Sequence, residues 1–300
     1  MVWLSVLAAL AALWLGADWV YARIVRARIR HWEQSFQWTD NGVREGCEAF
    51  EAGDPASPKA ILLVHGLNDS PACYRQLAPE LAAAGYYCRA IRLEGFGKST
   101  ADYAQGKRES WLEQIGDELQ QLRAEHSTVH YVGHSLGGAL GVHYLSDHPE
   151  AADRVVLLAP GIAVSNARSP LLSARNWHRV SNCLLWSTRV TASPFPLDAR
   201  EVDDSDYPYR TPFTPRSVFD ESFAVIDELP QRREHFVKPV LLAVSRNDKV
   251  IDWEAAEQFV QGSAAPVKEV EYFDDSGHAL LVDHTASRLA QRMLEFLKTE

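Results

Sequence analysis

The sequence predicts an α/β fold in which helices cover both faces of a mostly parallel central sheet. Short apolar runs typical of buried strands alternate with segments whose apolar residues recur at helical spacing. Polar loops follow several of these runs, at the sheet edge where catalytic side chains collect in such folds. The chain has 300 residues, which is enough for one large domain with a substantial core.

The predicted elements follow one another along the chain. The strands cover residues 61–64, 87–93, 128–132, 155–159, 240–244 and 269–273. The helices include residues 74–84, 111–122, 136–145 and 289–296. Residues 162–236 break the alternation, because they contain Pro, Trp, Tyr and Phe but few strand signals. An insertion of this length between two sheet strands is usually functional.

The most informative motif is Gly133-His134-Ser135-Leu136-Gly137, which lies between a strand-like run and a helix-like run. This context is typical of a nucleophile elbow, in which a serine lies on a sharp, strained strand-to-helix turn. The two glycines lack a Cβ and so leave room for the turn. We therefore predict that Ser135 is a nucleophile, with His134 pointing away from the reaction centre.

A serine nucleophile needs a base, and the base needs an acid that orients it. The expected chain order is Ser, then Asp or Glu, then His. The sequence offers Asp248 after one late strand-like run and His278 after the next. We assign His278 as general base and acid, and Asp248 as the carboxylate that orients it. Asp252 and Asp220 compete with Asp248 for this role.

Two backbone N–H groups are needed to hold the negative charge that develops on an attacked carbonyl oxygen. One should belong to Leu136, directly after the serine, and the other to Leu67 in the loop after the first central strand. His65 of the same loop is expected to brace that loop.

Together these residues resemble the α/β-hydrolase superfamily, in particular its carboxylesterase, monoacylglycerol lipase and lysophospholipase-like branch. The matching landmarks are Val64-His65-Gly66, Arg92 to Ser99, Gly133 to Gly138, Arg246-Asn247-Asp248 and Ser276-Gly277-His278. The resemblance covers residues 59–299 and implies the α/β-hydrolase fold, the Ser135–His278–Asp248 triad and a cap formed by residues 162–236. A serine at position 135 argues against epoxide hydrolases and haloalkane dehalogenases, whose nucleophile is aspartate.

The resemblance implies a serine hydrolase that cleaves carboxylic esters through an acyl-enzyme, with a lipid-like acyl ester as the expected substrate. No cofactor and no metal are expected. An acyltransferase or thioesterase with the same triad, and a proline-type peptidase, stay open as alternatives. The aromatic side chains of residues 162–236 either line an acyl pocket or form a small core of their own. The sequence leaves the physiological substrate and the oligomeric state open.

The N-terminal segment carries a second signal. Residues 2–17 are almost wholly apolar, Asp18 interrupts the run, and a short apolar stretch continues it before four arginines. About 20 apolar helical residues span a bilayer core of about 30 Å. We predict that residues 1–30 anchor the protein in the cytoplasmic membrane, with the hydrolase domain, residues 31–300, on the cytoplasmic side. A cleaved signal peptide of a secreted or periplasmic protein, and an amphipathic helix on the lipid surface, are the alternatives.

The composition argues against some classes of function. The formal net charge is −10, so no basic surface for nucleic acid is expected. The four cysteines are scattered and fit free thiols in a reducing compartment, although a disulfide stays open. The acidic run from Glu201 to Asp206 is expected to be a solvated loop, because nothing near it completes a set of metal ligands.

Overall fold

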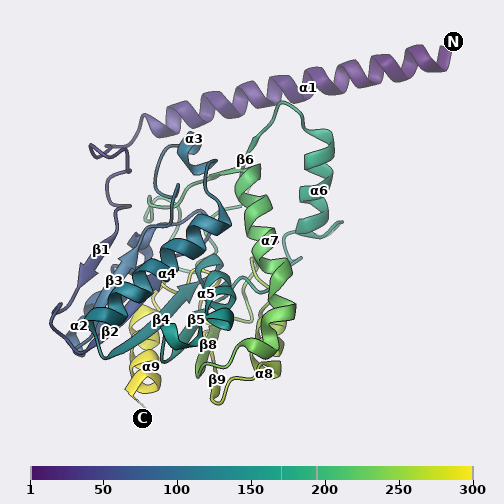
Figure 1. The fold of residues 1–300 in the computed structure, drawn as a ribbon. Helices are drawn as coiled ribbons and strands as arrows, with labels where there is room; N and C mark the ends of the chain where they lie inside the picture. The colour runs from purple at the N-terminus through teal and green to yellow at the C-terminus, as the bar shows by residue number, and fades with distance from the viewer. Residues whose placement is uncertain (1, 170, 194, 299–300) are drawn as a thin grey trace.

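A seven-stranded sheet forms the centre of the computed structural model, which describes residues 2–169, 171–193 and 195–298 (Figure 1). The strand order is β1-β3-β2-β4-β5-β8-β9. Only β1 pairs antiparallel within this sheet, and the other neighbours pair in parallel. The strands are β1 (Phe50–Ala52), β2 (Lys59–Val64), β3 (Tyr87–Ile91), β4 (Thr128–His134), β5 (Val155–Leu158), β8 (Val240–Val244) and β9 (Lys268–Tyr272).

Helices cover both faces of this sheet. On one face α2 (Leu77–Ala83) and α9 (Ala286–Lys298) pack against each other. On the other face α4 (Arg108–Glu125), α5 (Leu136–Asp147) and α7 (Arg216–Arg232) form a layer (Figure 1). The remaining helices are α1 (Val2–Glu33), α3 (Thr100–Tyr103), α6 (Ala174–Leu184) and α8 (Trp253–Gly262).

The central strands are apolar because they are buried on both sides. Every residue of β5 and of β8 is buried, and so are the last five residues of β2. Strands covered by helices on both faces read as continuous apolar runs instead of alternating ones. The predicted α/β architecture is therefore confirmed. The helix expected over residues 74–84 differs in detail, because a 3₁₀ turn at Pro71–Tyr74 precedes α2.

Residues 162–236, called the insertion below, connect β5 to β8. They contain α6, α7 and a two-stranded antiparallel pair formed by β6 (Val190–Ala192) and β7 (Phe213–Pro215). Its aromatic residues have different surroundings. Phe213 of β7 is buried against Val25 and Ile29 of α1, and Phe219 and Phe223 of α7 pack near His178 of α6. Trp177 and Trp186 are exposed.

The N-terminal helix α1 has two dissimilar halves. Its C-terminal half packs on the rest of the chain through Ala22, Val25 and Ile29, which are buried. Its N-terminal half extends beyond the other elements, and Trp3 is 81% exposed (Figure 1). The helix from Trp3 to Glu33 is long and apolar enough to cross a membrane, with a mean hydropathy of 1.6 over 18 residues. A signal sequence would meet the same criteria.

Candidate active site

Ser135 lies on a strained turn between β4 and α5. Its φ of 52° and ψ of −115° place a non-glycine residue in the left-handed half of backbone space, which is typical of functional sites. A Cβ on Gly133 would lie 2.5 Å from the carbonyl oxygen of Gly137, and a Cβ on Gly137 would collide with the carbonyl of Val64. Both glycines are therefore required by the close approach of backbone to backbone.

His278 lies between Ser135 and Asp248. Its Nε2 atom is 3.0 Å from the Ser135 Oγ, and its Nδ1 atom is 2.8 Å from the Asp248 Oδ2. With Nδ1–H donating to the carboxylate, Nε2 is free to accept the serine proton. The structure thus brings together the three side chains that the sequence singled out. They come from the carboxyl ends of β4, β8 and β9, as the parallel order of these strands allows.

The Asp248 carboxylate is buried and charged. Burial alone would raise its pKa, but the His278 imidazole and the N–H groups of Ile251 and Val250 bring the pKa below the ordinary value. These two N–H groups donate to Oδ1 at 2.9 and 2.7 Å, so Oδ2 is left for His278. A carboxylate held in this way fixes the orientation of the imidazole and stabilises its protonated form.

The two competing aspartates lie elsewhere. Asp252 caps α8 and accepts the N–H of Ala255. Asp220 lies on α7 and pairs with His178 of α6, with 2.6 Å between Oδ1 and Nε2. Both carboxylates therefore have other partners, and the His278 ring is bonded by Asp248 instead.

The loop that contains Leu67 lies directly beside Ser135. A Cβ on Gly66 would be 2.8 Å from the Ser135 Cβ, so the backbone before Leu67 touches the serine. Asn68, which has a φ of 61°, accepts a hydrogen bond from Tyr103 at 2.9 Å. This hydrogen bond holds the loop against the Ser135 turn.

His65 braces the same loop from within. Burial lowers its pKa to about 4, so the imidazole is neutral. Nδ1 donates to the Gly66 carbonyl at 2.9 Å, and Nε2 accepts the N–H of Leu93 at 3.2 Å. The ring is fully buried and uses both nitrogens on backbone groups.

His134 differs from its prediction, because it packs against the candidate base. Its ring centroid lies 5.0 Å from that of His278, and its Nε2 donates to the His278 carbonyl at 3.1 Å. Burial, with the neighbouring His278 imidazole, lowers the pKa of His134 to about 3. The alternation of side chains along β4 directs His134 and Ser135 to different sides, but the loop after β9 places His278 within reach of both residues. The neutral ring therefore supports the backbone of His278.

One residue that the sequence did not single out, Asp198 of the insertion, holds the loops that carry Asp248 and His278. Its Oδ2 accepts the N–H of Lys249 at 2.9 Å and that of His278 at 3.1 Å. Its Oδ1 accepts from the Arg168 guanidinium at 2.9 Å, and its side chain is 9% exposed. Its carbonyl accepts the N–H of Ala279. No spacing rule marks such an aspartate, because its partners are backbone groups of distant loops.

Asp283 ties the insertion to the same region. The carboxylate is buried and accepts the N–H groups of Arg200 and Glu201. It also accepts the hydroxyl of Ser276, two residues before His278, at 2.9 Å. The segment after Asp198 is therefore held against the loop that carries the candidate base.

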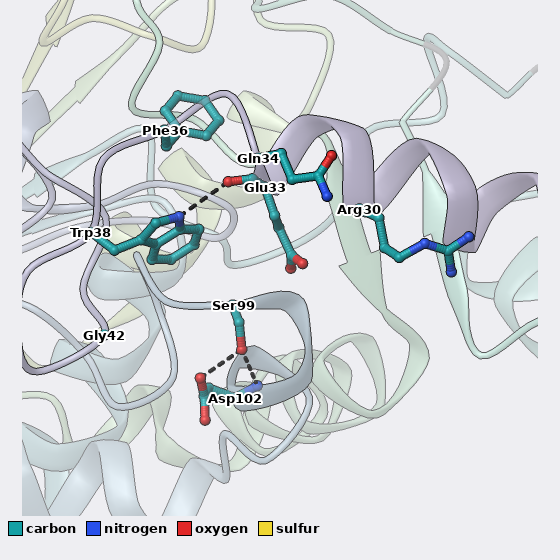
Figure 2. A pocket seen from close by; sticks show the side chains of 8 residues that line it. All are labelled: Arg30, Glu33, Gln34, Phe36, Trp38, Gly42, Ser99 and Asp102. Carbon is teal, nitrogen blue, oxygen red and sulfur yellow. Dashed lines mark hydrogen bonds between the residues drawn. The ribbon is translucent and has the colours of Figure 1, made fainter.

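A cavity of about 530 Å³ lies away from Ser135, where the end of α1 meets the start of α3 (Figure 2). Its acidic side chains already have local partners. Glu33 accepts the N–H of Thr100, and Asp102 pairs with Ser99 at the N-terminus of α3. The polar groups of this cavity therefore join α1 to the rest of the chain.

The described residues contain no group of three or more His, Cys, Asp or Glu side chains that could hold a metal ion. All four cysteines are free thiols, and only Cys183 is exposed. Asp203, Asp204 and Asp206 of the acidic run take part in local turn contacts, including an ion pair between Asp204 and Arg210.

The chain is similar in sequence to known lipases and esterases. The monoacylglycerol lipase of Bacillus sp. (strain H-257) is 24% identical over 254 residues, which are 85% of this chain and 95% of the lipase. The carboxylesterase of Bacillus subtilis is 24% identical over 83% of this chain and 94% of its own.

Solved structures share the fold. The monoacylglycerol lipase of Paleococcus ferrophilus superposes with a TM-score of 0.70 at 21% identity, over 83% of this chain and 97% of its own. The monoglyceride lipase of Saccharomyces cerevisiae superposes with a TM-score of 0.72 at 14% identity, over 83% and 90%. The family model described as serine aminopeptidase S33 matches residues 55–285, from the turn before β2 to the start of α9. Since this match spans most of the chain and the whole region around Ser135, the protein belongs to the serine aminopeptidase S33 family of α/β-hydrolases.

Proposed function

We propose that the protein is a serine hydrolase that cleaves carboxylic esters, with lipid-like acyl esters as substrates. One observation carries this proposal: the unbroken hydrogen-bonded series from Ser135 Oγ through His278 to Asp248. The monoacylglycerol lipase and carboxylesterase among the relatives support an ester as substrate.

The proposed reaction uses this series twice. His278 Nε2 takes the Ser135 proton while the oxygen attacks the ester carbonyl, and the N–H groups of Leu67 and Leu136 hold the negative oxygen. His278 then gives its proton to the departing alcohol, which leaves an acyl-serine. Water, deprotonated by His278, attacks the acyl-serine and releases the acid, and the proton returns to Ser135. Asp248 stabilises the imidazolium in both halves.

The proposal is tested by labelling and by turnover. A fluorophosphonate should attach to Ser135, located by peptide mass, and p-nitrophenyl esters from acetyl to palmitoyl should be hydrolysed. Ser135→Ala should lose both, with turnover lower by at least about 10³-fold. Ser127→Ala, on an exposed turn, is the matched control. If the folded protein is neither labelled nor able to hydrolyse any of these esters, the proposal is overturned.

A peptide substrate is the second candidate, because the family description names an aminopeptidase. Such an enzyme needs a carboxylate that binds the substrate amine. The acidic run near Asp203 makes local turn contacts, which favours the ester. Faster cleavage of aminoacyl p-nitroanilides than of any ester would reverse this preference.

We also propose that α1 anchors the protein in a membrane. Its exposed side chains from Trp3 to Leu15 are almost all apolar, whereas its other half packs on the hydrolase. A cleaved signal sequence would not need those packed residues. The intact mass of the protein extracted from membranes separates these cases, since a retained helix requires that residues 2–33 be present.

A further inference from the structure

Asp18 is a buried carboxylate in the apolar part of α1. Its residue is only 4% exposed. Oδ2 accepts the backbone N–H groups of Trp186 at 2.9 Å and Ser187 at 2.6 Å. Oδ1 accepts the hydroxyl of Thr188 at 2.7 Å and its N–H at 3.3 Å. An unpaired carboxylate at this position would be costly near lipid, and here four donors of the insertion satisfy it.

A second contact lies one helical turn away. The indole N–H of Trp14 donates to the carbonyl of Leu184 at 2.9 Å. Trp14 and Asp18 are four residues apart and so share one face of α1. Residues 184–188 of the insertion therefore run along this face, just after α6 ends (Figure 1).

Large apolar side chains are exposed on both sides of this contact. Trp186 is 72% exposed and Leu184 is 45% exposed, and on α1 the residues that directly follow Trp14 and Asp18, Leu15 and Trp19, are exposed as well. Tryptophan is enriched where protein meets the membrane–water interface. Contiguous exposed apolar side chains of this kind mark an interaction surface.

Basic residues adjoin the same surface. Arg23 stacks on Trp19, with 4.9 Å between the guanidinium carbon and the ring centroid. Arg26, Arg28 and Arg30 follow on α1. Such a cluster next to an apolar helix is complementary to the anionic headgroups of a bilayer.

We propose that residues 184–188 enter the interfacial layer of a lipid bilayer together with α1, and that Asp18 is the clasp that holds them there. The inference rests on the proposed anchoring of α1. Because Asp18 fixes these residues beside α1, insertion of the helix carries Leu184 and Trp186 to the same depth. The insertion, which also holds the catalytic loops through Asp198, is thereby placed where a lipid ester would arrive.

Cys183 provides a direct test, because it is the exposed thiol and precedes Leu184. A nitroxide is attached to Cys183 of the full-length chain in vesicles of phosphatidylethanolamine and phosphatidylglycerol. Collisions with a water-soluble nickel complex and with oxygen then report depth. We expect the accessibility of the Cys183 label to nickel to fall about threefold or more relative to the same labelled protein without vesicles, and its accessibility to oxygen to rise. Asp18→Ala should restore the nickel value.

The matched control is a nitroxide at Glu254→Cys in a Cys183→Ser background. Glu254 is exposed on α8, which lies at the opposite end of the molecule from α1 (Figure 1). The label at position 254 should stay accessible to nickel with and without vesicles, and with and without the Asp18→Ala substitution. Near-UV circular dichroism shows whether Asp18→Ala keeps its fold, and Asp18→Asn, which keeps one acceptor oxygen, should give an intermediate value.

The outcomes separate this inference from the proposals on which it rests. If the chain sediments with vesicles but the Cys183 label stays accessible to nickel, the anchor stands and the clasp is overturned. The clasp is likewise overturned if folded Asp18→Ala leaves the label protected. If the chain does not sediment with vesicles, the anchor itself fails. No turnover is needed, so the test also works in Ser135→Ala.

Discussion

Two aspartates hold the insertion at two places. One lies outside the insertion and accepts hydrogen bonds from it, and the other lies within the insertion and accepts hydrogen bonds from outside it. Asp18 lies on α1 and accepts three consecutive backbone N–H groups of the insertion. Asp198 lies on the insertion and accepts the N–H groups of Lys249 and His278. The same carboxylate chemistry thus joins the insertion to α1 at one point and to the candidate active site at the other.

This difference separates two effects that substitutions in the insertion could have. Loss of the Asp198 contacts lets the loops of Asp248 and His278 move, so the chemical step should suffer with any ester. Loss of the Asp18 contacts leaves those loops held, so the position of the insertion relative to lipid should change. The following predictions test this division.

The largest effect is expected for Asp198→Ala. The substitution removes the acceptor of two N–H groups in the catalytic loops and leaves the Arg168 guanidinium without its carboxylate. A misplacement of about 1 Å at a reacting group can cost about 10²-fold in rate. We expect kcat for p-nitrophenyl butyrate to fall by about 10–100-fold with little change in KM. Steady-state kinetics and the rate of fluorophosphonate labelling measure this.

Asp220→Ala is the matched control, because Asp220 is an exposed carboxylate of the insertion that pairs with His178 and Asn182 of α6 and with neither loop of the candidate triad. Its kcat should stay close to that of the unmodified chain. Asp198→Asn keeps one acceptor oxygen and should recover part of the loss. A drop in activity that only follows the fraction of unfolded protein would show that Asp198 has no positioning role.

A third aspartate, Asp69, contacts the insertion from the loop beside Ser135. The hydroxyl of Tyr207 donates to its Oδ1 at 2.7 Å. Burial raises the pKa of Asp69 to about 6, against the opposing effects of this hydrogen bond and of Arg210 and Arg44. The folded protein therefore holds a proton that the unfolded chain releases near pH 4. Stability from this group is lost as the pH rises from about 4 to about 6.

Asp69→Asn should remove that loss, since the amide oxygen can still accept from Tyr207. At pH 7 the free energy of unfolding should rise by about 1–2 kcal/mol, and at pH 4 the two proteins should be equal. Urea unfolding in detergent at pH 4, 5, 6 and 7 measures the difference. A difference that does not vary with pH would refute the assignment.

Asp283 provides a comparison of opposite sign. Burial alone would raise its pKa, but the N–H of Arg200 and the hydroxyl of Ser276 bring it below the ordinary value. Its contribution to stability is therefore present above about pH 4 and is lost as the pH falls through the lowered pKa. Asp283→Asn should be destabilised at pH 7, and the deficit should shrink toward acid pH.

The sequence could predict where the candidate triad residues lie, because turn geometry and sheet topology restrict their positions. The Ser135 turn needs Gly133 and Gly137 on either side, and a parallel sheet places the loops after its strands at one edge. Residue type, spacing and chain order therefore marked Ser135, Asp248 and His278.

The contacts of the insertion could not be predicted in this way. Asp18 was visible as an interruption of an apolar run, but its partners are backbone N–H groups, which every residue type offers. Asp198 had no visible signal for the same reason. His134 was expected to point away from the reaction centre because neighbouring residues of a strand point to opposite sides. This rule does not account for the loop after β9, whose His278 packs on the His134 ring.

The smallest effect is expected for Thr188→Val, which tests one bond of the Asp18 clasp. The Thr188 residue is buried, and its hydroxyl donates to Asp18 at 2.7 Å. Valine keeps the shape but not the donor, and three backbone N–H groups remain on the carboxylate. We expect the free energy of unfolding to fall by about 0.5–1.5 kcal/mol. Urea unfolding in detergent measures it.

A double-mutant cycle shows whether this loss belongs to the clasp. In an Asp18→Ala background the carboxylate acceptor is absent and only the long 3.4 Å contact of the Thr188 hydroxyl with the backbone carbonyl of residue 18 remains. Thr188→Val should therefore cost little there, and the coupling energy should be about 1 kcal/mol. Equal costs in both backgrounds would mean that the Thr188 hydroxyl does not bind Asp18. The clasp would then depend on backbone donors alone, and residues 186–188 could be exchanged freely so long as their N–H groups stay in place. A coupling energy near the expected value would instead show that side-chain identity at position 188 contributes to holding the insertion against α1.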